Sequence, residues 1–73
     1  MTLDQAEVIF VSQGKRWFRV FSDFPKDSAF AASEVARLGF TGKILHFQQE
    51  DLSRGHKDDR LGIGFVSTWY IDA

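Results

Sequence analysis

The chain of 73 residues contains no cysteine and only one proline. The absence of cysteine excludes disulfide bonds, a thiol nucleophile and a cysteine-ligated zinc site. It also fits a reducing compartment, so we expect a cytoplasmic protein. The sequence has no apolar run long enough to cross a bilayer and no basic and apolar leader at its start. We therefore expect no membrane partner.

Clustered positive charge is also missing. The chain has 9 Lys and Arg residues against 10 Asp and Glu residues, which gives a net charge of -1. Proteins that bind nucleic acid need grouped cations to contact phosphates, so this balance argues against a nucleic-acid partner.

Aromatic residues, in contrast, are abundant, with eight Phe, two Trp and one Tyr. A single small core cannot enclose them all, and the remainder must lie on a second sheet face or at an interface.

One stretch, Phe24 to Leu38, has a clear helical period, and the sequence on either side has the character of strands and turns. Ser22 or Asp23 would cap its start, Pro25 would occupy the first turn, and Gly39 would end it in the left-handed conformation. The residues predicted to face the sheet are Phe24, Ser28, Ala31, Ala32, Val35 and Leu38. Lys26, Glu34 and Arg37 would point away, and Phe30 projects with them, either packed under a loop or contacting a partner.

Four segments rich in β-branched and aromatic residues are predicted to be strands. They are Ala6 to Ser12, Lys15 to Ser22, Lys43 to Gln49 and Leu61 to Ile71. Gln13-Gly14 predicts a tight turn between the first two, and the polar segment Gln49 to Arg60 predicts a long, mobile loop between the last two. The fold class is therefore α+β: one ββαββ domain over 1–73, with a four-stranded antiparallel sheet and one helix packed on one face.

Both predicted faces of this sheet carry bulky apolar groups, and one helix can cover only one of them. In the second strand Phe18 and Val20 alternate with Trp17, Arg19 and Phe21. We therefore expect a homodimer or a dedicated partner surface built from alternate residues of the second and fourth strands. The tryptophans are the expected anchors, with at most one of them exposed. The predicted partner-binding residues are Trp17, Arg19, Phe21, Phe30, Phe65 and Trp69.

The best cluster of reactive side chains is Ser53, His56, Asp58 and Asp59, in the polar loop. It lacks the G-x-S-x-G elbow of a serine hydrolase and any recognised metal spacing. His46 stands alone on a strand, and the glycines at Gly62 and Gly64 do not precede a helix as a phosphate loop would. We expect no catalytic residue, no metal and no cofactor, and hence no enzyme.

Gly62-Ile63-Gly64-Phe65-Val66 resembles the core of the ribonucleoprotein strand of RNA-recognition motifs, whose aromatic residues stack on bases. Leu61 stands where that family has a Lys or Arg, while Ile63 and Thr68 replace aromatic residues. By this resemblance only Phe65 would keep a stacking role. A single-stranded nucleic-acid-binding module is therefore one alternative function, with Phe65, Trp69 and the cations Lys15, Arg16 and Arg19 as its contacts.

The order of elements supports a second resemblance. A hairpin from Val8 to Phe21, a helix with alanines at 29, 32 and 36, then Gly39 and a second hairpin together resemble small phage-encoded inhibitors of the anti-CRISPR type. That resemblance implies a non-enzymatic protein-binding module that covers a surface of a host effector complex, and it assigns no functional residue. A small homodimeric structural protein is the remaining alternative.

Overall fold

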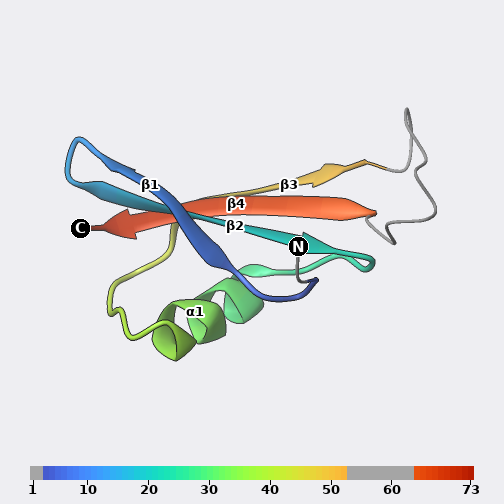
Figure 1. Ribbon diagram of the computed structural model, residues 1–73, viewed down its shortest axis with the longest axis horizontal. Helices are drawn as coiled ribbons and strands as arrows, with labels where there is room; N and C mark the ends of the chain where they lie inside the picture. Colours follow the sequence, from blue (N-terminus) through green and yellow to red (C-terminus); the bar gives the residue numbers. More distant parts are fainter. Residues whose placement is uncertain (1–2, 53–63) are drawn as a thin grey trace.

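The computed structural model describes residues 3–52 and 64–73 and confirms the predicted α+β fold. Its elements are β1 (Glu7–Ser12), β2 (Lys15–Ser22), α1 (Ser28–Arg37), β3 (Leu45–Asp51) and β4 (Phe65–Asp72). The four strands form one sheet in the order β1-β2-β4-β3, and all neighbouring strands are antiparallel. The helix lies on one side of this sheet, below it in Figure 1. Segment 53–63, which holds most of the predicted mobile loop, lies outside the described residues.

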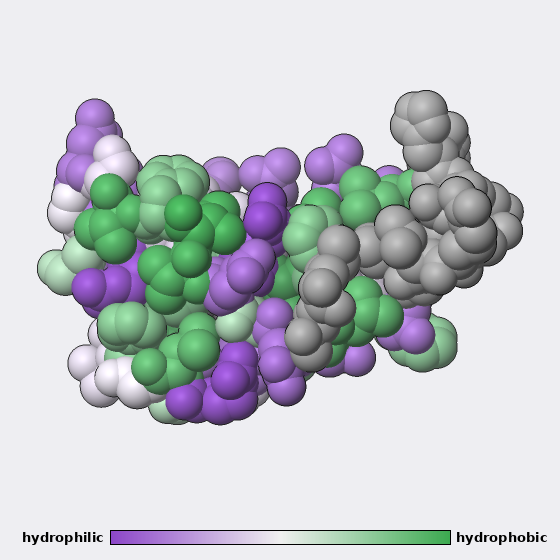
Figure 2. All heavy atoms as spheres, in the orientation of Figure 1, coloured by the Kyte–Doolittle hydropathy of each residue, from purple (hydrophilic) through white to green (hydrophobic). Residues whose placement is uncertain are grey.

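The β1–β2 hairpin closes through the predicted turn. Gln13 and Gly14 have φ values of 54° and 72°, the pair of positive φ angles that defines a type I′ turn. Ser12 and Lys15 are therefore the first pair of the ladder. The hairpin places β1 at the edge of the sheet. Figure 2 shows apolar side chains gathered on the left of the molecule, where Figure 1 draws the β1–β2 hairpin.

The helix is shorter than the sequence predicted, because it is capped by a different residue. Asp27 is the N-cap, and its carboxylate accepts a hydrogen bond of 3.0 Å from the backbone N–H of Phe30. Ser22 cannot cap the helix, since it ends β2 and its hydroxyl donates to the carbonyl of Phe24. Phe24 and Pro25 thus precede the helix, and Phe24 is 69% exposed instead of buried.

The end of the helix agrees with the prediction. Gly39 has a φ of 88°, in the left-handed region. Its N–H donates to Ala36, and the N–H of Phe40 donates to Val35, both at 3.0 Å. This pair of bonds is the Schellman motif, which satisfies carbonyls that the helix leaves free.

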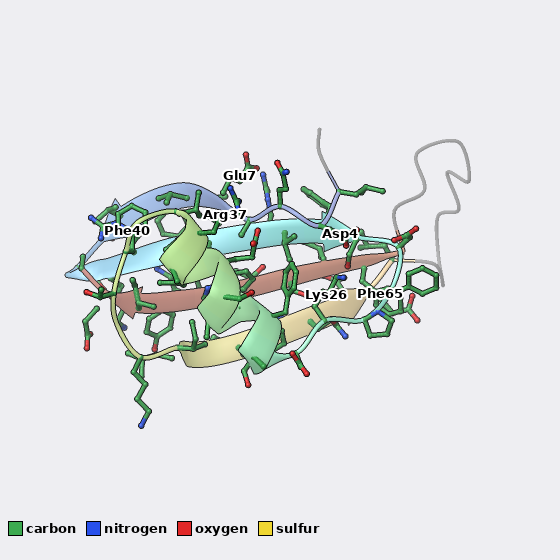
Figure 3. All side chains as sticks on the ribbon, turned by 90° about the horizontal axis from the view of Figure 1, so that it is seen from below. Asp4, Glu7, Lys26, Arg37, Phe40 and Phe65 are labelled. Atoms are coloured by element: carbon green, nitrogen blue, oxygen red, sulfur yellow. The ribbon has the colours of Figure 1, made fainter. Side chains whose placement is uncertain are left out.

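The core lies between the helix and the sheet face beneath it. Figure 3, seen from the helix side, shows α1 crossing the two central strands. The buried apolar residues are Ala6, Phe18, Val20, Ala31, Val35, Trp69 and Ile71. Phe18 and Trp69 stack with ring centroids 5.8 Å apart, and Phe47 stacks on Trp69 at 5.9 Å. The alternation predicted for β2 and β4 is confirmed, since Phe18, Val20, Trp69 and Ile71 all belong to this face.

Glu34 was predicted to face solvent and is instead 7% exposed. Its carboxylate accepts hydrogen bonds from the backbone N–H of Ala6 at 2.8 Å and from Arg37 at 3.0 and 3.1 Å. Arg37 also donates to the carbonyl of Ala6 at 3.1 Å, and Figure 3 shows it reaching toward the β1 side of the sheet. The segment that leads into β1 therefore covers the helix surface that a helical wheel assigns to solvent.

The third strand begins and ends two residues later than predicted and contains a bulge. The register shifts between Leu45 and Gln48, and His46 has a φ of 53°. Leu45 and Phe47 were expected on one face, but the extra residue of a bulge reverses the alternation. Phe47 therefore packs on Trp69 on the helix side, while His46 lies beside Tyr70 on the opposite face.

Glu34 provides a direct test of how the helix is held. We expect Glu34→Ala to lower the free energy of unfolding by about 1–3 kcal/mol, because it leaves the buried N–H of Ala6 without its acceptor. The matched control is Glu50→Ala on β3, where an exposed glutamate is removed and the change should stay below about 0.5 kcal/mol. Urea unfolding followed by circular dichroism measures both. Equal midpoints for the two variants would show that Glu34 does not hold the helix.

The same carboxylate should make stability depend on pH in the acid range. Burial opposes ionisation of Glu34, but hydrogen bonds from Arg37 and Ala6 outweigh it, so its pKa lies below the usual value of 4.5. A lowered folded pKa means that this stabilisation is complete above pH 4.5 and is lost as pH falls through the folded pKa. Glu34→Gln should remove that part of the acid dependence, whereas Glu50→Gln should keep it. Parallel curves of stability against pH for wild type and Glu34→Gln would contradict this.

Candidate functional site

The sheet face opposite α1 is the candidate site. Alternation along β2 places Trp17, Arg19 and Phe21 on it, since Phe18 and Val20 face the helix. The antiparallel register sets Tyr70 beside Trp17 and Thr68 beside Arg19. Within the described residues, no second helix covers this face, which lies above the sheet in Figure 1. We call it the open face.

Each strand contributes one aromatic ring to a continuous row across the open face. Phe10 of β1 stacks on Trp17 of β2 at 5.4 Å between centroids, and Trp17 meets Tyr70 of β4 at 4.6 Å. His46 of β3 completes the row, 5.9 Å from Tyr70 and 6.4 Å from Trp17. We call these four residues the aromatic row. Such cross-strand contacts stabilise a sheet, and they also present a rigid, partly apolar surface.

Charged side chains of both signs border the aromatic row. The ammonium of Lys15 lies 4.8 Å from the centre of the Tyr70 ring, and the guanidinium of Arg19 lies 4.9 Å from that of Phe21. Arg19 also pairs with Glu7 at 3.3 Å, in an exposed contact. The register brings two more acids to this face: Asp72 opposite Lys15, and Glu50 opposite Val66. The open face therefore combines a central row of rings with a mixed, nearly balanced border.

Of the six residues predicted to bind a partner, the structure brings three together on the open face: Trp17, Arg19 and Phe21. Trp69 belongs to the core instead. It is 0% exposed, between Phe18 and Phe47, because residue 69 alternates onto the side that the helix covers. Trp69 is therefore not at the surface of the chain, which agrees with the expectation that at most one tryptophan is exposed.

The other two predicted residues also lie away from the open face. Phe65 pairs with Ser22 and so belongs to the sheet face that the helix covers. It is the first residue of β4, and Figure 3 shows it at that end of the strand. Phe30 is half-buried and packs against the core, with the ammonium of Lys26 at 4.7 Å from its ring centre. Phe30 also lines an open hollow with Pro25, Lys26 and Asp27, so its surroundings are set by the turn that precedes the helix.

Three members of the aromatic row were not predicted. Phe10 could have been found from the turn, since a two-residue loop at Gln13-Gly14 sets Phe10 opposite Trp17. Tyr70 follows from alternation once Trp69 is known to face the helix. Nothing in the sequence predicts the position of His46, because the bulge that places it beside Tyr70 leaves no periodic pattern of apolar and polar residues.

The loop cluster Ser53, His56, Asp58 and Asp59 lies outside the described residues. Among residues 3–52 and 64–73, no three His, Cys, Asp or Glu side chains are grouped as a metal site requires. The same part of the chain contains no helix long and apolar enough to cross a membrane.

No family model matches the chain, and the comparisons with curated proteins and with solved structures found no match. The assignment of the site therefore depends on the geometry of the open face.

The two tryptophans give this geometry a spectroscopic test. In Trp69→Phe only Trp17 emits, and we expect iodide to quench it because it lies on the open face. In Trp17→Phe only Trp69 emits, and we expect it to resist iodide because it is fully buried. Circular dichroism controls for folding of both variants. Equal quenching of the two would mean that the helix does not cover the face to which Trp69 belongs.

Proposed function

We propose that this chain is a protein-binding module without catalytic activity, and that the open face is its contact surface. The observation that carries the proposal is the aromatic row, in which four rings from four strands meet on a face that no described element covers. Aromatic residues are enriched at the centres of protein interfaces because they bury a large area at low entropic cost. A polar border around an apolar centre is the usual arrangement of such surfaces.

The charges around the row favour a protein over a nucleic acid. Among the strand residues that the structure describes, Lys15 and Arg19 are the cations of the open face, and Arg19 is already paired with Glu7. Glu50 and Asp72 add negative charge by their register positions. Phosphate backbones need unpaired, grouped cations, whereas a protein surface of mixed sign can complement this border.

We further propose that the partner is a host effector complex and that the chain acts as a phage or mobile-element inhibitor. The support is the ββαββ layout, on which the resemblance to small inhibitors of the anti-CRISPR type depends. Such an inhibitor acts by occupying a surface in a fixed stoichiometry. A rigid sheet suits this role, since a preorganised surface loses little conformational entropy on binding.

The test is co-elution of the purified chain with members of a panel of purified CRISPR effector complexes. We expect one complex to bind, and Trp17→Ala with Tyr70→Ala to weaken that binding by roughly thirtyfold or more, as the loss of an interface hot spot does. The control is Phe24→Ala, which removes an exposed ring away from the open face. Unchanged binding of the double variant would show that the contact surface lies elsewhere on the chain. If no complex in the panel binds the chain, the effector-complex proposal is wrong.

Single-stranded nucleic-acid binding is the second candidate, because Trp17 and Tyr70 lie side by side on the central strands as stacking residues do in sheet-based binders. The test is fluorescence anisotropy of labelled single-stranded DNA and RNA across a salt series. We expect no measurable binding at physiological salt. Tight binding that weakens steeply with salt, and that Trp17→Ala abolishes, would place this candidate first.

A further inference from the structure

Two residues of opposite charge lie side by side at one end of the open face. Lys15 of β2 and Asp72 of β4 are partners in the register, next to the aromatic row. The ammonium of Lys15 lies 4.8 Å from the centre of the Tyr70 ring, which places it on the open face. Asp72 shares that face because it alternates with Tyr70 along β4, and it is exposed. This end of the open face therefore presents a cation and an anion in a fixed order across the sheet.

Rows of side chains cross the open face one after another. The aromatic row lies next to the charged pair. A polar row follows, in which Arg19 has Thr68 on one side and Glu7 on the other. Beyond it, Phe21 pairs with Val66. Apolar and polar rows thus alternate along the strands, so a surface that covers the open face needs rows of the same character at the same spacing. A second copy of the open face has them.

We propose that two copies of the chain pack open face against open face, about a two-fold axis that runs parallel to the strands between β2 and β4. This axis sets each row against the same row of the second copy and reverses the strand order, so β2 faces β4 and β1 faces β3. Trp17 then meets Tyr70 of the second copy, and Phe10 meets His46 of the second copy. The four rings of each aromatic row thereby form one layer with the four rings of the other.

The charged residues determine this orientation. With the axis parallel to the strands, Lys15 of each copy faces Asp72 of the other, and Arg19 faces the uncharged Thr68. A second copy turned end for end about the aromatic row would instead set Lys15 against Arg19, and like charges that face each other are destabilising. Two-fold symmetry repeats each favourable contact. This complementarity identifies the occupant of the open face as a second copy.

The size of the open face predicts a reversible dimer. Four strands of up to eight residues give a flat area of roughly 500 Å² per copy, below the roughly 800 Å² per partner of typical stable complexes. At the low concentrations used for fluorescence the dimer dissociates and Trp17 is open to iodide. The second copy occupies the surface proposed above for the host complex, so that complex must displace it. This consequence rests on the proposed function, whereas the dimer needs only this chain.

Exchange of the two charges tests the dimer and its orientation together. Sedimentation of the wild-type chain should show a monomer–dimer equilibrium. Lys15→Asp and Asp72→Lys should each raise the dissociation constant about tenfold or more, because each sets two pairs of like charges against one another across the axis. A mixture of the two variants should dimerise again, since every pair between them then has opposite charges. Recovery in the mixture shows that neither variant has lost its fold, and circular dichroism confirms this.

The matched control makes the same changes of charge outside the strands. Lys43→Asp and Asp23→Lys alter exposed residues and should leave the wild-type equilibrium unchanged, alone and mixed. The proposal is wrong if the wild-type chain remains monomeric at millimolar concentration, if the two open-face variants dimerise as the wild type does, or if their mixture does not recover. None of these measurements involves a host complex. A failed dimer therefore leaves the proposed function intact, and a panel of complexes without a binder leaves the dimer intact.

Discussion

A helix of ten residues can cover only one face of a four-stranded sheet, and the rest of this structure follows from that limit. Ten helical residues extend about 15 Å, and the axes of the outer strands lie about 14 Å apart. One helix therefore crosses the sheet once. The rings of Phe18 and Trp69 lie beneath the helix and belong to the core. The rings of Trp17 and Tyr70 lie on the open face, where they pack only against each other and against neighbouring side chains of the sheet.

The parts of the fold that could be predicted from sequence are those set by local physics. The turn at Gln13-Gly14, the alternation of β2 and the glycine that ends the helix each depend on a few adjacent residues. Glu34 could not be placed in this way, because its partner Ala6 is 28 residues away in the chain. A helical wheel separates apolar from polar residues, but it cannot show that an earlier segment returns to cover the polar side.

The site was only partly predictable for a related reason. Alternation shows that Trp69 and Tyr70 lie on opposite faces, but it does not show which face the helix covers. Both tryptophans were therefore predicted as anchors, although the helix covers the face to which Trp69 belongs. Assembly of the aromatic row also needs the strand order, which brings β2 and β4 together at the centre. The bulge at His46 adds the last ring through a backbone irregularity that has no periodic signature.

Phe10 belongs to the aromatic row and also to an edge strand, where its side chain is 49% exposed. Rings that only stabilised the sheet would be needed at its centre, where each has neighbours on both sides, and not at an edge where one side faces water. Burial of Phe10 against the partner proposed for the open face would supply that missing neighbour, which gives the ring a role that stabilisation of the sheet alone does not explain.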